Sequence, residues 1–266
     1  MTMPGAGGPS TDRGFWDDQW DERSRRGLSE RLLHGRDFGA RGAFLRLLKA
    51  QLPDVALKGA RVVELGGAAS RYLIDLALCE GARVTAIDYS AVGIARTREL
   101  FAKAGVSGEA IRADMFLWQN DGEPFDLVVH FGVLEHFSDP LPLIATSARL
   151  LRPDGTVFFT MPNLGALGAR LWQRNAPQNY AAHVFHSDDA IAAACRESGL
   201  ELRKVFWFGP PLIRMAPAQK RGVIEVLSDL GHAAVCIAGT IAPSIYLKGH
   251  RAISNQRGFV AVKVRS

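Results

Sequence analysis

An α/β fold with a mostly parallel sheet is predicted by two observations. From Arg61 onward, short apolar runs of strand length alternate with segments of helical periodicity. Small and acidic residues follow several of these runs, where sheets of this kind carry their ligand sites. Because strands that alternate with helices form βαβ units, we expect one seven-stranded sheet with helices on both faces.

The expected elements follow in order along the chain. Each strand is an apolar run between turn residues, and the first reads as buried on both faces. The strands cover residues 61–66, 83–88, 109–114, 125–132, 156–163, 201–208 and 258–264. The helices cover residues 70–80, 90–104 with Ser90 as N-cap, and 141–151, and a fourth begins after Ser187. The sequence RPDG at 152–155 is a turn signal before the fifth strand.

The 266 residues read as one domain with additions. Residues 1–14 are rich in Gly, Pro and Ser and are expected to form a disordered tail, and 15–266 form the domain. It divides into an N-terminal helical segment at 15–58, a core at 59–209, an insertion at 210–256 and a final strand at 257–266. The insertion is expected to cover a ligand pocket or to make a homodimer contact.

Composition excludes several classes of protein. The three cysteines, Cys79, Cys195 and Cys236, have no CxxC spacing, which argues against a disulfide framework and indicates a cytoplasmic protein. The net charge is +5, but the sequence has no dense run of Lys and Arg, so no nucleic-acid partner is expected. The longest apolar stretch, 233–247, is interrupted by Pro243 and is too short for a membrane span.

A glycine-rich turn, preceded by an acid, follows the first strand. Glu64 stands two residues before Gly66, and Gly67 follows. Small residues let the backbone turn sharply and approach a ligand closely, although any tight turn favours glycine. A carboxylate here repels a pyrophosphate but attracts a cationic amino group. The dinucleotide fingerprint GxGxxG is absent, since Ala-Ala-Ser comes next.

Acids also end the next two strands. Asp88 lies ~20 residues beyond the glycines, where such folds place an acid on ribose hydroxyls. A carboxylate can accept two hydrogen bonds from vicinal hydroxyls. After the third strand, Asp114 can accept a hydrogen bond from an exocyclic amine, while Met115 can pack against a flat ring. A capping or turn role is the alternative for both acids.

Five motifs, in this order and spacing, resemble those of class I S-adenosylmethionine-dependent methyltransferases. They are ELGGAAS, VTAIDYS, IRADMF, FDLVVHFGVLEHFSDP and LLRPDGTVFFTMPN, within residues 61–163. The resemblance implies a Rossmann-like fold, S-adenosylmethionine as cofactor and a small-molecule acceptor. It departs from the family at the third glycine position, which is less glycine-rich here, so the turn could be slightly displaced. The implied cofactor residues are Glu64, Gly66 and Gly67 at the methionine end, Asp88 on the ribose, Tyr89, Asp114 and Met115 around the adenine, and the backbone carbonyl of His130 toward the amino group.

The run Leu134 to Pro140 resembles the LEHxxDP run of the ubiquinone-biosynthesis O-methyltransferases. The sulfonium is already electrophilic, so the protein positions the nucleophile and, for a hydroxyl, removes its proton. His136 is the first candidate base, with an ionisation expected near neutrality, and shaping the loop is its alternative. His183 and His186, between strands five and six, are the other candidates, or simply loop histidines. Glu135 is expected to bind the acceptor.

Two further expectations concern a lid and a metal. Trp16 and Trp20 share one helix face and either pack on the core or, as the resemblance implies, belong to a lid that helps to bind the substrate. Some ubiquinone-type enzymes hold a divalent metal in the LEH run, but here Gly132 stands where that pattern needs an acid. With no third ligand near the His-x-x-His pair, no metal is expected.

The competing functions are distinguished by particular residues. A nicotinamide oxidoreductase would have GxGxxG and no acid at Glu64. A nucleic-acid base methyltransferase would have a Pro-Pro-aromatic run after strand four, where His130 begins HFGV instead. N- or C-methylation and a non-catalytic S-adenosylmethionine-binding scaffold remain open, with O-methylation favoured.

Overall fold

The computed structural model describes residues 40–211 and 248–265, with single helical positions at 223, 227, 230, 231, 234 and 238. The predicted tail at 1–14, Trp16 and Trp20 of the predicted lid, and most of the insertion at 210–256 lie outside the described residues. Their roles and the proposed division of the domain stay predictions.

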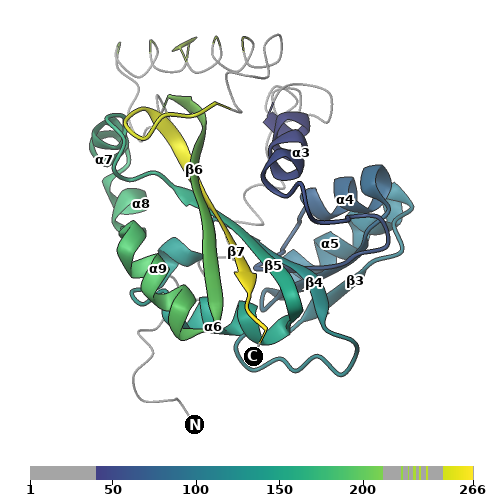
Figure 1. Cartoon of the computed structure of the whole chain (residues 1–266). Coiled ribbons are helices and arrows are strands. Elements are labelled where there is room, and N and C mark those ends of the chain that lie inside the picture. The colour runs from purple at the N-terminus through teal and green to yellow at the C-terminus, as the bar shows by residue number, and fades with distance from the viewer. Residues whose placement is uncertain are drawn as a thin grey trace.

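One seven-stranded sheet forms the centre of the protein, in the order β3-β2-β1-β4-β5-β7-β6 (Figure 1). Its neighbouring strands are parallel except β7, which runs antiparallel to β5 and β6. This arrangement confirms the predicted fold. The strands are β1 (Arg61–Leu65), β2 (Arg83–Asp88), β3 (Glu109–Arg112), β4 (Phe125–Phe131), β5 (Leu151–Pro162), β6 (Leu200–Pro211) and β7 (Ser254–Lys263).

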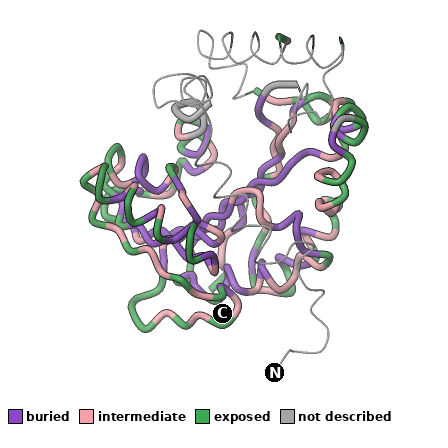
Figure 2. Tube along the Cα trace, turned by 180° about the vertical axis from the view of Figure 1, so that it is seen from behind, coloured by how far each residue is buried: buried purple, intermediate pink, exposed green. Residues whose placement is uncertain are grey.

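Helices cover both faces of the sheet, as predicted. On one face lie α3 (Ala40–Gln51), α4 (Tyr72–Glu80) and α5 (Ala91–Ala104), which pack on one apolar cluster. On the other lie α6 (Leu141–Leu150) and α9 (Asp188–Glu197), which pack on a second. The central strands are buried between these two layers (Figure 2).

The two-sided burial explains why the strands are almost continuously apolar. Successive side chains of a strand point to opposite faces. Val62 and Phe158 are fully buried on the α3–α5 face, while Val63 and Phe159 are fully buried on the α6–α9 face. A strand that packs on both faces cannot alternate apolar with polar residues.

The main departures from the predicted elements lie around β5. The strand begins at Leu151, because Leu151 pairs with Phe125 before the register shifts. The expected turn is present inside the strand, where Asp154 has a φ of 60°. Two short helices that were not predicted, α7 (Ala169–Asn175) and α8 (Pro177–Ala181), follow β5.

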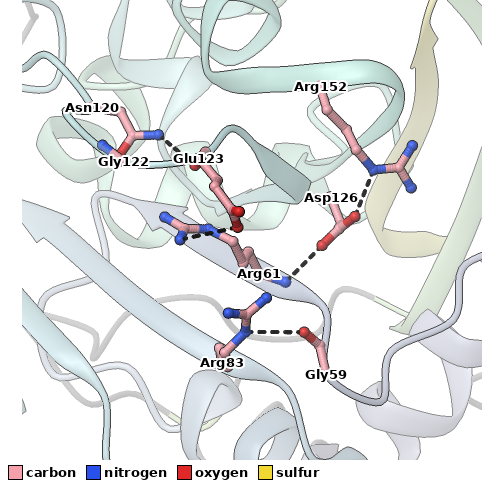
Figure 3. Close-up of polar contacts among 8 residues, drawn as sticks. All are labelled: Gly59, Arg61, Arg83, Asn120, Gly122, Glu123, Asp126 and Arg152. Atoms are coloured by element: carbon pink, nitrogen blue, oxygen red, sulfur yellow. Dashed lines mark hydrogen bonds and ion pairs between the residues drawn. The ribbon is translucent and has the colours of Figure 1, made fainter.

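Charged residues close the edge of the sheet where the parallel strands begin (Figure 3). Asp126 accepts hydrogen bonds from the Arg61 amide at 2.8 Å and from Arg152 Nε at 2.6 Å. Arg83 Nε donates to the Gly59 carbonyl at 3.1 Å. A groove of about 890 Å³ also lies at this amino-terminal edge. The acids that follow the strands are at the opposite edge.

Candidate functional site

The predicted site residues meet where the strand order reverses. β1 has β2 on one side and β4 on the other, so the loops after these parallel strands leave the same edge in different directions. Such a switch point is where open α/β sheets bind ligands. Glu64 is the last residue but one of β1, Asp88 is the last residue of β2, and Gly132 follows β4.

The turn after β1 requires both glycines. Gly66 has a φ of 71°, and a Cβ on it would lie 2.7 Å from the Val133 side chain. A Cβ on Gly67 would lie 3.2 Å from the Ala86 Cβ. Both glycine amides donate to the Ile87 carbonyl, at 2.9 and 3.1 Å. The turn is therefore attached to β2, and its backbone approaches the loop after β4 closely.

Ala69 takes the left-handed conformation that glycine adopts more readily, with a φ of 51°. This conformation costs an alanine about 1–2 kcal/mol. The buried hydroxyl of Thr97 compensates, because it accepts the Ala69 amide at 2.7 Å and donates to the Gly93 carbonyl at 2.9 Å. A Cβ on Gly93 would lie 2.5 Å from the Ala68 Cβ, so only glycine lets α5 come this close. Sequence analysis missed both residues, although a glycine in the first turn of a helix was the available signal.

Two buried carboxyls face this turn. Glu64 is 4% exposed and accepts a hydrogen bond from the Ser70 hydroxyl. Burial is the main cause that raises the pKa of Glu64 to about 8, the hydroxyl of Ser70 opposes the rise, and the charge of Asp88 adds to it. Two neighbouring buried acids favour a cationic ligand group, because a nearby positive charge stabilises their ionised forms.

Asp88 has the turn role considered as its alternative, since the N-cap of α5 is Ser90, and its position also suits ligand binding. Its Oδ2 accepts the Ala68 amide at 3.2 Å, and its Oδ1 accepts the Ser90 amide at 2.8 Å. Each carboxylate oxygen offers more than one lone pair, so these bonds leave acceptor capacity for hydroxyls. Tyr89, which is half-buried, follows directly.

The other predicted cofactor residues have different environments. Asp114 is exposed and its Oδ1 accepts the Phe116 amide at 2.9 Å, as in a turn, while Met115 is buried in the core. The His130 ring is fully buried and stacks on Phe159 with centroids 4.7 Å apart. Within the described chain its two ring nitrogens have no hydrogen-bond partner, and burial lowers its pKa to about 3.

The proposed acceptor residues gather beside the end of β4. The 3-10 helix η1 (Leu134–His136) carries Glu135 and His136, and His183 reaches them from the segment after α8. One possible ligand atom of each residue lies within 4.8 Å of the others. Glu135 is 2% exposed, and burial raises its pKa to about 8.

Backbone carbonyls orient both histidines. His136 Nδ1 lies 3.2 Å from the Ala182 carbonyl, and His183 Nδ1 lies 2.7 Å from the Asn179 carbonyl. A carbonyl only accepts, so each Nδ1 carries the hydrogen and Nε2 is the basic nitrogen of the neutral ring. Burial, and then the nearby His183, lower the pKa of His136 to about 4, and burial lowers that of His183.

His186 is placed differently from the other two histidines. It is 4% exposed, and its Nε2 lies 3.3 Å from the Leu134 carbonyl and 3.0 Å from the Phe137 carbonyl. This nitrogen therefore donates to the backbone of the turn that carries His136. The contacts favour a role in holding that turn.

The cluster changes the argument about a metal. The expected absence of a metal rested on the lack of a third ligand near His183 and His186. His183 instead meets Glu135 and His136 in space, and this group does not include His186. The absence of a metal stays a prediction. Two imidazoles and a carboxylate are a ligand set that zinc-type metals accept. Nδ1 contacts to backbone carbonyls also resemble the outer contacts of metal-bound histidines.

The fold and the acids at its switch point define a Rossmann-like enzyme that binds a nucleoside-containing cofactor. Residues 37–205 match the family described as Methyltransferase domain. The chain belongs to this family and is an S-adenosylmethionine-dependent methyltransferase. Among the described residues, no helix has the length and apolar character needed to cross a membrane.

Proteins of known sequence and structure agree with this assignment. A ubiquinone biosynthesis O-methyltransferase of Aromatoleum aromaticum is 34% identical over 56% of this chain and 67% of its own. The magnesium protoporphyrin IX methyltransferase of Synechocystis, solved with bound S-adenosylhomocysteine, has a TM-score of 0.60 at 14% identity and covers 94% of this chain and 97% of that chain. A methyltransferase of Thermotoga maritima has a TM-score of 0.61 at 16% identity, over 95% and 100% of the two chains.

The residues at the switch point fit S-adenosylmethionine. Its cationic methionine end suits the buried Glu64, whose pKa is raised in the absence of a cation. Its ribose hydroxyls would suit Asp88, and the bare backbone of Gly66 and Gly67 would let it approach the turn closely.

Proposed function

We propose that the protein methylates a hydroxyl group of a small-molecule acceptor. The observation that carries this proposal is the pairing of His136 and His183, whose ring centroids are 4.8 Å apart beside the switch point. Both rings have a basic Nε2 in the tautomer that their backbone contacts select. The name of the Aromatoleum relative, an O-methyltransferase, supports the same chemistry.

In this proposal one group of residues at the switch point binds the cofactor and the group beside the end of β4 binds the acceptor. Bound S-adenosylmethionine supplies an electrophilic methyl group. Glu135 orients the acceptor, whose oxygen gains the methyl group while its proton passes to Nε2 of His136 or His183. The cofactor is held by Glu64, Gly66, Gly67, Asp88, Tyr89, Asp114, Met115 and the His130 carbonyl.

The test is turnover of single histidine variants with phenolic and aliphatic alcohols at saturating cofactor. His136→Ala or His183→Ala should lower turnover by about 10²- to 10⁴-fold, the usual effect of a general base. Affinity for S-adenosylhomocysteine should be unchanged. Glu123→Ala, at an exposed position on the opposite edge of the sheet, is the control and should keep wild-type turnover. If both cluster variants keep more than about a tenth of wild-type turnover, pure positioning or N-methylation is the better account.

A metal-assisted reaction is the second candidate, because the three side chains form a possible ligand set. The general-base proposal requires that activity survive exhaustive chelation. Loss of turnover that zinc or magnesium restores, together with metal bound by wild type and not by His183→Ala, would establish the second candidate instead.

A further inference from the structure

We propose that Arg257 is a positioning residue for methyl transfer, which holds the His183 segment against the turn that carries His136. The inference rests on the proposed function and extends it to a residue on β7, outside every motif of the sequence analysis. We call residues 183–188, which run from His183 into the start of α9, the clamp segment.

The Arg257 guanidinium is buried among groups of the clamp segment. Its side chain is 4% exposed, and its Nη1 lies 3.1 Å from Asp188 Oδ1. Nη2 donates a hydrogen bond to the His186 carbonyl. The cation also lies over the rings of Phe185 and Phe259, 5.1 and 5.2 Å from their centroids. One side chain of β7 therefore contacts three residues of the clamp segment.

On its other side the clamp segment contacts the turn of η1. The Val184 amide donates to the Glu135 carbonyl at 2.7 Å, and His186 Nε2 donates to the Phe137 carbonyl at 3.0 Å. The segment is thus held between Arg257 and the turn. Without Arg257 the clamp segment keeps its bonds to the turn, and His183 keeps its contacts with Asn179 and Trp172. The segment is then held on one side only, so His183 should leave its place beside His136 more often.

A purely stabilising role explains the arginine less well. A buried ion pair is weak support for stability, because desolvation offsets most of the attraction. Arg257 Nε has no partner within the described chain. The neighbouring positions on this face of β7, Phe259 and Ala261, are apolar and fully buried, so an apolar side chain would pack at 257 as well. The arginine provides directed contacts that an apolar side chain cannot make.

The test compares Arg257→Met and Arg257→Lys with Arg265→Met. Arg265 lies outside the far end of β7, is exposed and pairs with Asp154, so it is the control. In Arg257→Met we expect hydrogen exchange at the Val184 amide to be faster by about tenfold or more, and exchange at the Gly66 and Gly67 amides to be unchanged.

Turnover and binding complete the test. In Arg257→Met the acceptor KM should rise about tenfold or kcat should fall by as much, while S-adenosylhomocysteine affinity stays within about twofold of wild type. Arg257→Lys should recover part of the loss, because lysine keeps the charge without the two-sided contact. Should Arg257→Met not fold, Asp188→Asn at a half-buried position should show the same effects at smaller size.

Three results would overturn the proposal. They are unchanged exchange at Val184, faster exchange with wild-type turnover, and equal losses in S-adenosylhomocysteine affinity and acceptor KM. Exchange and cofactor binding need no acceptor. A wild-type protein that methylates no hydroxyl would therefore refute the proposed function, while the exchange rates still decide whether Arg257 holds the clamp segment.

Discussion

The buried carboxyl of Glu64 predicts that cofactor binding releases a proton. Without a ligand its pKa is raised to about 8, chiefly by burial, so near neutrality it is mostly protonated. The cationic methionine end of the cofactor favours the carboxylate and should return the pKa toward its ordinary value. Affinity should therefore increase with pH until the ligand-free protein has lost this proton.

The size of the effect follows from the pKa. With a pKa of about 8 without ligand and a return to the ordinary 4.5 in the complex, affinity should rise roughly 20-fold between about pH 6 and about pH 7.5. Glu64→Gln keeps a similar shape without the ionisable group. It should bind more weakly at the higher pH and show almost no pH dependence in this range.

Titration calorimetry with S-adenosylhomocysteine measures this directly. Repeating the titration in buffers of different ionisation enthalpy counts the protons released, and wild type should release close to one per ligand at the lower pH. A wild-type affinity that does not change with pH would refute the reasoning. So would a pH dependence that Glu64→Gln retains in full.

The further predictions concern four substitutions and one chemical treatment. Asp88→Ala should weaken S-adenosylhomocysteine binding by about 1.5–3 kcal/mol, because it loses charge-assisted hydrogen bonds to hydroxyls. Ala69→Gly should raise the free energy of unfolding by up to about 1 kcal/mol, since glycine tolerates the positive φ, whereas Gly93→Ala should lower it. His130→Phe should stabilise the fold by about 1–3 kcal/mol by removing two buried nitrogens without partners. Chelation should leave turnover unchanged.

Calorimetry and denaturant unfolding check these outcomes. Wild-type ligand affinity in a folded Asp88→Ala protein would leave that acid only its turn contacts with the Ala68 and Ser90 amides. Burial lowers the pKa of His130 from 6.5 to about 3, so its ring stays neutral in the folded protein while the unfolded chain binds a proton below about pH 6.5. His130 therefore lowers the free energy of unfolding progressively as the pH falls from 6.5 to about 3. The gain from His130→Phe should therefore be greatest in acid, and a gain that shrinks in acid would contradict this assignment.

The sequence and the structure predict different pH dependences of turnover. Sequence analysis expects a basic histidine to ionise near neutrality. Burial, with His183 nearby, lowers the pKa of His136 to about 4, so the acid limb assigned to it should lie near pH 4. His136→Ala should remove that limb. A limb near 6.5 that depends on His136 would contradict the buried environment described here.

The fold was accessible from sequence because each β-strand and its following turn leave a local signal. The apolar run at 61–65 and the acid and glycines around its end needed no knowledge of distant residues. The early start of β5 was not predictable in this way, because Leu151 is in the strand only through pairing with Phe125. The short helices α7 and α8 also lack a long apolar periodicity.

The site was predictable only as far as its contacts are local. The role of Thr97 depends on a hydrogen bond to Ala69 across 28 residues, and that of Arg257 on contacts across 69 residues or more with Asp188 and His186. The third possible metal ligand is likewise visible only where His183 reaches Glu135. The spacing of residues along the sequence does not indicate contacts between residues this far apart.

The most direct test of the central claim is a crystal structure of the protein with S-adenosylhomocysteine and an alcohol acceptor. The account predicts the amino-acid end beside Glu64, the ribose hydroxyls on Asp88, and the sulfur facing the acceptor hydroxyl, which lies within hydrogen-bond distance of His136 or His183. The ligand bound in the groove at the amino-terminal edge of the sheet, or its sulfur turned away from both histidines, would contradict it.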